Sequence, residues 1–505
     1  MVTRRRFIVG AGLGAGLAAT MPWRGLRAQT SGKTSGKTGE TLAVNDVHSK
    51  LNPTRLHRIE RPARLGELRA AIARARADGR AICIAGGRHS MGGQQFLTGG
   101  VMIDTRDLRE VLAFDAEAGI VEVEAGIQWP ELIAHLNQVQ AGASGQWAIA
   151  QKQTGADRLT IGGALASNVH GRGLTMQPFI SDVESFTLID GNGDMRTCSR
   201  NENAELFRLA IGGYGLFGVI YSVQLRLARR QKLRRVVEIL NIDDVMPAFE
   251  RRIAAGFVYG DFQYDINEAS DGFLRRGVFS CYEPVDPATP IPSAQAELSE
   301  GDWRNLIALA HTGKQQAFDL YTGHYRKTSG QIYWSDTHQL SIYIDDYHAE
   351  LDRIAGARNP ASELITEIYV PRTQLPSFMA DVAADFRRHA TQVIYGTVRL
   401  IERDGESFLA WARQSYACII FNLHVVHNRL QQAQAADAFR RLINRAIERG
   451  GSYFLTYHRY AGRAQVEACY PQMPAFLKRK QQYDPADLFQ SDWYRHYAAM
   501  FADRL

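Results

Sequence analysis

The sequence predicts an α+β fold, in which helices and strands mix without the regular alternation of a parallel α/β protein. Three observations lead to this prediction. The chain has 505 residues, of which 45% are hydrophobic, enough for two or three domains with sizeable cores. Short helix-type and strand-type apolar patterns follow one another irregularly up to about residue 230. From about residue 231 the elements become longer and richer in tyrosine and arginine.

The first half of the chain contains most of the short elements. Pro62 begins a helix with a periodic apolar face, and Gly79 ends it. Residues 81–85 then read as a buried strand. The same reasoning predicts helices over 129–136 and 205–210, and strands over 101–104, 120–124, 185–190, 195–198 and 219–227.

The second half is predicted to contain longer elements. Residues 395–399, 417–427 and 453–459 have strand patterns, and residues 433–449 form a helix between the last two strands. No internal repeat of fixed period is present. Mixed elements of this kind agree with the α+β class.

The first 28 residues read as an export signal. Arg4 and Arg5 follow Thr3 and precede a weakly apolar stretch over 7–19, and Ala28 offers a small residue for cleavage. Paired arginines at this place point to the twin-arginine route, and the apolar stretch is too short to favour a permanent anchor. We therefore expect a periplasmic or secreted protein without a stable membrane anchor.

The composition excludes several classes of protein. The net charge of +6 falls to about +1 without the five arginines of the export signal, so a nucleic-acid partner loses its electrostatic support. The five cysteines are widely spaced and never form a CxxC pair, so neither a zinc knuckle nor a disulfide framework is expected. A charged content of 22% and a mean hydropathy of -0.25 also argue against a disordered or multi-span membrane chain.

Two glycine-rich segments are candidates for binding an anion or a flat ring. The first, GGRHSMGG from Gly86, follows the strand at 81–85, and its backbone N–H groups can surround an anion. A tight strand connection is an equally good interpretation of this segment alone. The second is the loop TIGGALASNVHG over 160–171, whose small residues would let a ring lie against the backbone. A third glycine run, at 213–218, follows a helix and precedes a strand, which is the reverse of the dinucleotide-binding order.

Together these segments resemble the vanillyl-alcohol oxidase/p-cresol methylhydroxylase (PCMH-type) superfamily of FAD-linked oxidases. GGRHSMGG, QTGADRLTIGGALASNVHG and the strand after GGYGLFGVI occur in that family's order within residues 53–230. The C-terminal YDPADLFQSD, from Tyr483, is similar to the close of aldonolactone and alditol oxidases and of decaprenylphosphoryl-ribose oxidase.

The resemblance implies a two-lobed FAD-binding domain of the α+β class, with FAD bound extended between the lobes. An α+β substrate (cap) domain with an antiparallel sheet would cover the isoalloxazine. We therefore expect an export signal over 1–28, a flexible linker over 29–52, the FAD domain over 53–230, the substrate domain over 231–460, and a segment over 461–505 that returns to the FAD domain.

The resemblance also assigns cofactor-binding residues. The pyrophosphate would be held by Gly86, Gly87, Arg88, His89 and Ser90. The flavin or its ribityl chain would be lined by Thr154, Gly155, Gly162, Gly163, Ser167, Asn168, His170 and Gly171. Backbone groups of Gly218, Val219 and Ile220 would meet the adenine or the ring.

His89 has a second implied role. In lactone and alditol oxidases a histidine in a GGxHS-like loop forms a covalent bond to the 8α-methyl carbon of the flavin, and His89-Ser90 stands at that place. This chemistry needs a neutral imidazole nitrogen as nucleophile. The alternative is a histidine that only hydrogen-bonds the phosphate. A second, cysteinyl tether is excluded, since Asp157 occupies the region where that cysteine would lie.

Candidate catalytic residues come from the second half of the chain. The related oxidases carry a Glu-x-Arg pair, and Thr397-Val398-Arg399 aligns with it, so Arg399 is present and the acid is missing. Arg399 would stabilise charge on an oxygen or on the reduced flavin. Tyr457, His458 and Arg459 stand where these families have a lysine motif, and would supply a base and a cation.

Asn422 and His424 share one face of their strand and would line the same cavity. His424 and His427 point to opposite faces, so no metal site is predicted there. Glu367 and Tyr369 are candidates of lower rank. Taken singly, each of these residues is more often plain core or surface than catalytic.

The function implied is oxidation of a CH–OH group of a small polar substrate (a sugar, polyol or lactone-like compound) by hydride transfer to FAD. Oxygen or another acceptor would reoxidise the flavin. Two alternatives stay open: an oxidase of a lipid-linked sugar, and an exported solute-binding protein without flavin.

Overall fold

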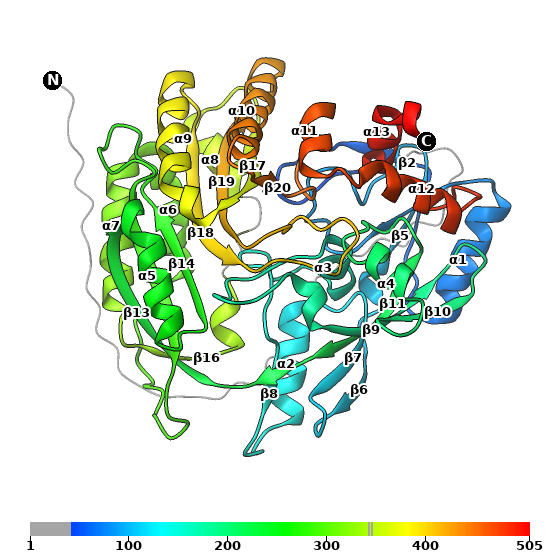
Figure 1. Ribbon diagram of the computed structural model, residues 1–505, viewed down its shortest axis with the longest axis horizontal. Coiled ribbons are helices and arrows are strands. Elements are labelled where there is room, and N and C mark those ends of the chain that lie inside the picture. Colours follow the sequence, from blue (N-terminus) through cyan, green and yellow to red (C-terminus); the bar gives the residue numbers. More distant parts are fainter. Residues whose placement is uncertain (1–41, 342–343, 345–346) are drawn as a thin grey trace. The chain divides into compact units, whose positions relative to one another are not determined.

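The computed structural model describes residues 42–341, 344 and 347–505. The predicted export signal and the linker up to residue 41 lie outside the described residues. Within residues 42–505, five sheets and the helices between them form the fold (Figure 1). In the described part of the chain, no helix combines the length and apolarity needed to cross a membrane.

Two sheets form the first part of the fold. The smaller one is parallel, in the order β3 (Arg58–Glu60), β5 (Val101–Asp104) and β4 (Ile82–Ala85), and packs against helix α1 (Leu65–Ala77). The larger one is antiparallel, in the order β10-β9-β11-β7-β6. Its strands are β6 (Val111–Asp115), β7 (Ile120–Glu124), β9 (Val183–Ile189), β10 (Met195–Ser199) and β11 (Val219–Arg226).

Helices α2 (Trp129–Val139), α3 (Ile161–Ser167) and α4 (Ala204–Ala210) belong to the same part. Leu132 and Ile161 lie in one core with strands β7 and β11, whereas Leu68 and Ile82 lie in a second core with β5. The first part therefore has two lobes.

An eight-stranded antiparallel sheet forms the second part of the fold, in the order β16-β13-β15-β14-β18-β19-β17-β20. Its long strands are β13 (Lys232–Asn241), β14 (Tyr259–Tyr264), β15 (Arg276–Pro284), β17 (Ala361–Pro371), β18 (Val393–Ile401) and β19 (Tyr416–Val426). The short strands β16 (Ile332–Trp334) and β20 (Ser452–Tyr453) form its edges. The predicted α+β class, with an antiparallel sheet in the second part, is confirmed.

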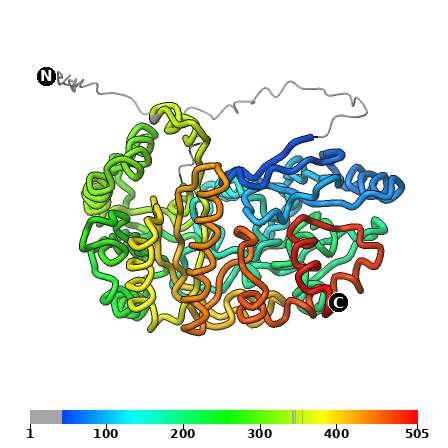
Figure 2. Tube along the Cα trace, turned by 90° about the horizontal axis from the view of Figure 1, so that it is seen from above, coloured from blue at the N-terminus to red at the C-terminus, as the bar shows by residue number. Residues whose placement is uncertain are grey.

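Helices pack on both faces of this sheet. The helices α5 (Ile242–Ala254), α9 (Leu375–His389) and α10 (Arg429–Ile447) cover one face, where Phe249 meets Phe279 and Phe386 meets Phe421. In Figure 2, α9 and α10 run side by side in yellow and orange. The helices α6 (Glu300–Thr312), α7 (Lys314–Lys327) and α8 (Tyr347–Ala355) pack on the other face.

The C-terminal segment returns to the first part of the fold (Figure 2). After α11 (Arg463–Cys469) and α12 (Met473–Tyr483), Phe489 forms a parallel bridge with Ile82 of β4 before α13 (Asp492–Met500) begins. The carboxylate of Asp484 accepts the N–H groups of Leu488 and Phe489, and also accepts a hydrogen bond from the buried Lys480 at 2.7 Å. The aspartates of the YDPADLF motif therefore build a turn that adds a strand-like edge to the small sheet.

Most predicted elements are confirmed within two to four residues, but three predictions are wrong. Residues 42–52 are not a flexible linker, because β1 (Leu42–Val44) pairs with β2 (Thr54–Leu56) and Asp46 and Ser49 are buried. Residues 160–171 are not all loop, because α3 forms over most of them with Thr160 as its N-cap.

The predicted strand over 453–459 is also wrong. Only Ser452–Tyr453 pair with β17. The chain then turns away, and the carbonyls of Leu455 and Thr456 accept hydrogen bonds from Gln94 and from the N–H of Met91. Contacts with the first glycine loop therefore replace strand pairing.

Candidate active site

Two adjoining cavities lie beside the glycine loops, and the larger one extends to the eight-stranded sheet. The larger has a volume of about 650 Å³ and the smaller about 70 Å³. They share four lining residues, His89, Ser90, Leu159 and Ser167. The larger volume lies within the range of small-molecule sites, so the pair offers a slot that leads into a substrate-sized chamber.

The smaller cavity is a glycine cradle. Its walls include Gly86 and Gly87 from the first glycine segment, and Gly162 and Gly163 from the second. A Cβ atom on Gly86 would lie 2.1 Å from Oγ1 of Thr160, and one on Gly162 would lie 2.7 Å from Cβ of Ala125. The two segments therefore meet in space, and they approach this closely only because they lack side chains.

Polar groups without partners face the smaller cavity. Arg88 has a positive φ of 59°, which costs a residue with a side chain about 1–3 kcal/mol. Its Nε atom and Oε1 of Gln95 are buried without hydrogen-bond partners, and both residues line the cavity. Burial, with Arg106 nearby, lowers the pKa of Arg88. A strained loop with an unpaired guanidinium nitrogen fits a cofactor that carries phosphate groups.

The structure brings most predicted cofactor residues to this slot. The smaller cavity is lined by Gly86, Gly87, Arg88, His89, Ser90, Gly162, Gly163, Ser167, Gly218 and Ile220. Thr154 and Gly155 line the larger one. Among the predicted set, Asn168, His170, Gly171 and Val219 line neither cavity.

Asn168 has a different role from the predicted one. It ends α3 in the left-handed conformation, at φ 48°, and is buried. Its Nδ2 atom donates to Asp404 at 2.9 Å, and its Oδ1 atom accepts the N–H of Ile180. These bonds fix the backbone next to the slot. They occupy the side-chain amide, so it does not hydrogen-bond the flavin ring.

One face of the eight-stranded sheet forms the far wall of the larger cavity. The strand register pairs Glu367 with Ile420 and Ile420 with Thr397, across β17, β19 and β18. Because paired residues point to the same face, Glu367 and Thr397 lie on one face with Arg399, which is two residues further along β18. Arg399, Asn422 and Tyr457 line the cavity, as predicted for residues of an active site.

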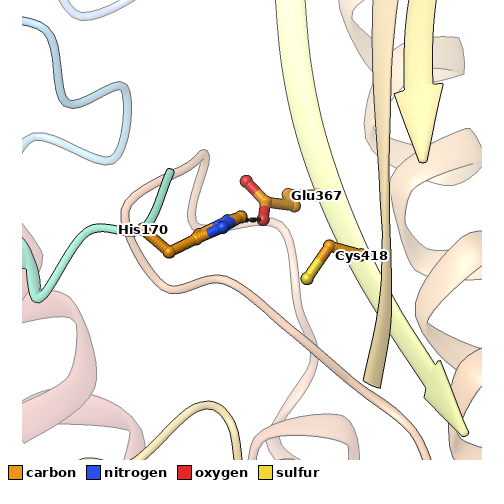
Figure 3. Close-up of side chains that lie close together, drawn as sticks. All are labelled: His170, Glu367 and Cys418. Atoms are coloured by element: carbon orange, nitrogen blue, oxygen red, sulfur yellow. Dashed lines mark hydrogen bonds and ion pairs between the residues drawn. The ribbon is translucent and has the colours of Figure 1, made fainter. Parts of the chain in front are cut away.

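A buried hydrogen-bonded network stands behind this wall. Nε2 of His170 is in very short contact with Oε1 of Glu367, as Figure 3 shows, and both side chains are fully buried. The hydroxyl of Tyr457 donates to Oε2 of the same carboxylate at 3.2 Å. Burial alone would raise the pKa of Glu367, but His170 lowers it below the ordinary value, so the carboxylate is ionised. Glu367, ranked low from the sequence, is therefore the centre of the network.

Cys418 completes a compact group with His170 and Glu367 (Figure 3). Their potential ligand atoms lie within 4.8 Å of one another. Burial and the Glu367 charge raise the pKa of the Cys418 thiol well above its usual value, so it is not a thiolate. Since His170 and Glu367 are already bonded to each other, this group favours a proton network over a metal site.

Arg399 has unused donors beside the cavity. Its Nε and Nη1 atoms are buried without hydrogen-bond partners, and the residue is 4% exposed. Thr397, which stands in place of the family glutamate, is also buried, and its hydroxyl lies 3.4 Å from Oδ2 of Asp261. The carboxylate that the sequence lacks at 397 is supplied to the same sheet face by Glu367.

The structure does not bring His458 and Arg459 to the cavity. Arg459 donates to the carbonyl of Asp492, and His458 stacks on Tyr460 at 5.1 Å between ring centres. Neither lines the larger cavity, because the chain turns after Tyr457. Their predicted role as a base and a cation therefore has no geometric support.

His48 is a residue that sequence reasoning missed. Its Nε2 atom lies 2.8 Å from Nδ1 of His89, and both residues line the larger cavity. Burial lowers the pKa of His48, and burial together with His48 lowers the pKa of His89 well below 6.5. His48 lies in the segment predicted as a flexible linker, and nothing in the sequence indicated its contact with His89.

Comparisons with known proteins agree with this geometry. A family model described as an FAD binding domain matches residues 57–199. An uncharacterized oxidoreductase of the fasciation locus of Rhodococcoides fascians is 28% identical over 50% of this chain and 60% of its own length. The L-gulonolactone oxidase of Mus musculus is 31% identical over 33% of this chain and 36% of its own length. Cytokinin dehydrogenase 4 of Oryza sativa subsp. japonica is 24% identical over 60% of this chain and 58% of its own length.

The chain spans between about a third and three fifths of the length of these curated relatives. The matched residues include β4, β5 and α3, which build the glycine cradle. The glycine walls of the cradle and the unpartnered atoms of Arg88 and Gln95 fit a cofactor that carries phosphate groups, as FAD does. Residues 57–199 therefore form an FAD binding domain, and the cofactor of the chain is FAD.

Proposed function

We propose that this protein is an oxidoreductase that oxidises a CH–OH group of a small polar substrate. FAD, when bound, supplies the acceptor for the hydride. The observation that carries the proposal is the network of His170, Glu367 and Tyr457, which has one end on the cavity wall and the other in the core. Such a network can accept the hydroxyl proton of a substrate during its oxidation.

The proton path is short. The substrate O–H bond breaks, its proton passes to the hydroxyl oxygen of Tyr457, and the proton of Tyr457 passes to Oε2 of Glu367. Burial and Glu367 raise the pKa of Tyr457 well above 10, so the phenol begins protonated and acts as a relay. His170 holds the carboxylate on its other oxygen. The unpaired guanidinium of Arg399 stabilises negative charge that develops on the substrate oxygen.

The chamber supports a polar substrate. Polar and aromatic side chains from the sheet, from α6 and α7, and from the segment after α3 line it, among them Asp261, Tyr395, Trp303, Tyr321 and Arg172. Nε of Arg172 and Oδ1 of Asp261 are buried without hydrogen-bond partners. The two side chains form an ion pair at 3.8 Å that leaves both of these atoms without a hydrogen bond. A charged pair of this kind beside the chamber favours a ligand with several hydroxyl or carbonyl groups, such as a sugar, polyol or lactone. The L-gulonolactone oxidase relative supports the same class.

We further propose that His89 forms a covalent bond to the flavin. Its lowered pKa keeps the imidazole neutral, which the nucleophile needs, and the hydrogen bond between its Nδ1 atom and Nε2 of His48 fixes the orientation of the ring. We also propose that the twin-arginine route exports the protein, as residues 1–28 predict. Replacing Arg4 and Arg5 by lysine would retain the precursor in the cytoplasm if it is correct, and cell fractionation would measure this.

Anaerobic reduction of the bound flavin tests the reaction. The wild-type protein is mixed with sugars, polyols, lactones, aromatic alcohols, a lipid-linked sugar and a cytokinin, and loss of the oxidised flavin absorbance is followed. Reduction by the first three classes supports the proposal. Reduction by the lipid-linked sugar or the cytokinin alone would replace it, and a colourless protein would remove the flavin reaction. Reoxidation with oxygen or a dye then distinguishes an oxidase from a dehydrogenase.

A further inference from the structure

A second group of ionisable side chains lies on the same sheet face, outside the residues assigned to the reaction. It contains His311 near the end of α6, His348 in α8, Glu363 in β17 and His424 in β19. We call it the three-histidine cluster. Glu363 pairs with His424 in the strand register, four residues along β17 from Glu367, so the cluster and the proton network are separate.

The side chains of the cluster converge on one carboxylate oxygen. Oε1 of Glu363 lies 3.6 Å from Nε2 of His311 and 3.6 Å from Nε2 of His348. Both distances are too long for a hydrogen bond. The rings of His311 and His424 meet edge to face, with centres 4.9 Å apart. The Glu363 carboxylate and the histidine rings therefore surround a small space, and Oε1 of Glu363 makes no hydrogen bond to His311 or His348.

Three atoms of the cluster are buried without any hydrogen-bond partner: Oε1 of Glu363, Nε2 of His311 and Nδ1 of His424. Glu363 is only 8% exposed. A buried carboxylate oxygen or imidazole nitrogen without a partner costs about 1–3 kcal/mol or more, and structures rarely leave several such atoms together. The arrangement therefore points to a ligand that accepts lone pairs from all three.

The spacing is close to that of a metal site. Tetrahedral Zn²⁺ bonds of about 2.0–2.2 Å place neighbouring ligand atoms about 3.4 Å apart and neighbouring imidazole centres about 5 Å apart. The two Glu363 contacts and the distance between the ring centres of His311 and His424 match these values. The potential ligand atoms of the cluster do not all lie within 4.8 Å of one another, so the side chains would have to close around an ion. The ring of His348, 6.4 Å from that of His311, would have to move inward by about 1 Å.

The protonation states suit a cation. Burial lowers the pKa of His348 to about 4, and burial and His311 lower the pKa of His424, so these rings are neutral lone-pair donors. Burial alone would raise the pKa of Glu363, but the neighbouring His311 and His348 and a hydrogen bond from Tyr347 lower it, so the carboxylate is ionised. Lys314, a cationic side chain whose charge acts on His424, is bound to Glu268 at 2.7 Å.

We propose that His311, His348, His424 and Glu363 bind a divalent transition-metal ion of the kind that prefers imidazole ligands, such as Zn²⁺. The ion would fix α6 and α8 to the sheet. It would also lie next to the cavity wall, because Oε2 of Glu363 accepts a hydrogen bond from Nδ2 of Asn422 at 3.3 Å. This metal site does not depend on the proposed reaction.

Metal content tests the proposal directly. The untagged holoenzyme is incubated with Zn²⁺, dialysed, and its metal and flavin contents are measured. One equivalent of Zn²⁺ per chain is expected, together with a rise in the unfolding temperature. Co²⁺ in the same site would give visible bands at longer wavelengths than the flavin. No retained metal in the wild-type protein would overturn the proposal.

Two variants locate the site. Glu363→Gln and His424→Gln are each expected to weaken Zn²⁺ binding more than about tenfold while the flavin content stays unchanged. His389→Ala removes an exposed histidine from the end of α9 and serves as the control, with wild-type affinity expected. Wild-type affinity in both cluster variants would show that the metal binds elsewhere. If a variant loses its flavin, the Co²⁺ spectrum of the wild-type protein still decides between nitrogen-rich and oxygen-only ligands.

Discussion

Nδ1 of His89 lies 2.8 Å from Nε2 of His48, and this contact joins the glycine cradle to the segment before it. The two ring centres are 4.8 Å apart. Both pKa values are lowered, chiefly by burial, so at neutral pH the rings are neutral and one donates to the other. A neutral imidazole whose proton is already shared with a neighbour is well prepared to act as a nucleophile.

We predict that His89→Ala releases its flavin. After acid precipitation, wild-type flavin should stay with the polypeptide and His89→Ala flavin should appear in the supernatant. His48→Gln should lower the covalent fraction, since the His89 ring loses the imidazole that orients it through Nδ1. His57→Gln, at an exposed position, is the matched control. Complete release of flavin from the wild-type protein would show that His89 only hydrogen-bonds the cofactor.

The proton relay predicts that removal of the Tyr457 hydroxyl strongly slows flavin reduction. Tyr457→Phe should slow anaerobic flavin reduction by about 100-fold, because a positioned proton acceptor contributes a factor of that order or more. Glu367→Gln should have a similar effect. Tyr460→Phe, which changes a ring stacked on His458 away from the cavity, should reduce flavin at the wild-type rate. Equal rates in Tyr457→Phe and Tyr460→Phe would contradict the relay.

The same network fixes the sign of the pH dependence. The lowered pKa of Glu367 keeps the carboxylate ionised at neutral pH, so the reductive rate should fall only at pH values below about 4.5. The raised pKa of Tyr457 excludes this phenol as the origin of any loss below pH 10. Stopped-flow measurements across the acidic range check both points. A half-maximal rate near pH 6.5 would instead indicate a histidine.

Local motifs were predictable from the sequence, and contacts across the fold were not. GGRHSMGG alone allowed either an anion-binding loop or a tight strand connection, and its order with the other two glycine-rich segments identified the cradle at Gly86. The carboxylate that takes the place of the missing acid could not be predicted, because only the register of β17, β19 and β18 puts Glu367 on the same sheet face as Thr397. His170 lies almost 200 residues before its partner Glu367. The strand pattern at 453–459 failed because tertiary hydrogen bonds to the glycine loop replaced strand pairing.

The cradle predicts opposite effects of two glycine substitutions. Gly86→Ala places a Cβ 2.1 Å from Oγ1 of Thr160, and should cost about 1–3 kcal/mol of stability and lower FAD retention. Gly66→Ala, in α1 with nothing within 4 Å, should instead stabilise the protein by about 0.5–1 kcal/mol. Urea unfolding with parallel flavin quantification measures both. Unchanged FAD content in Gly86→Ala would show that the cradle does not hold the cofactor.

His458, which the structure separates from the cavity, predicts a stability effect. Burial lowers its pKa from 6.5 to about 4. Between these pH values, the His458 imidazole is protonated in the unfolded chain and neutral in the folded protein. The free energy of unfolding therefore falls as the pH drops from 6.5 towards 4. The full loss from this residue is on the order of 3 kcal/mol, from a pKa difference of about 2.5 units.

His458→Gln removes this titration and should flatten the pH dependence. Chemical unfolding of both proteins at pH 7.5 and pH 4.5 gives the comparison, and the other buried histidines cancel because they are present in both. The wild-type protein should lose more stability than the variant over this interval. His135→Gln, a half-buried histidine on α2, should behave like the wild-type protein. If the variant loses as much stability on acidification as the wild type, His458 is protonated in the folded protein, and its role as a base would have to be considered again.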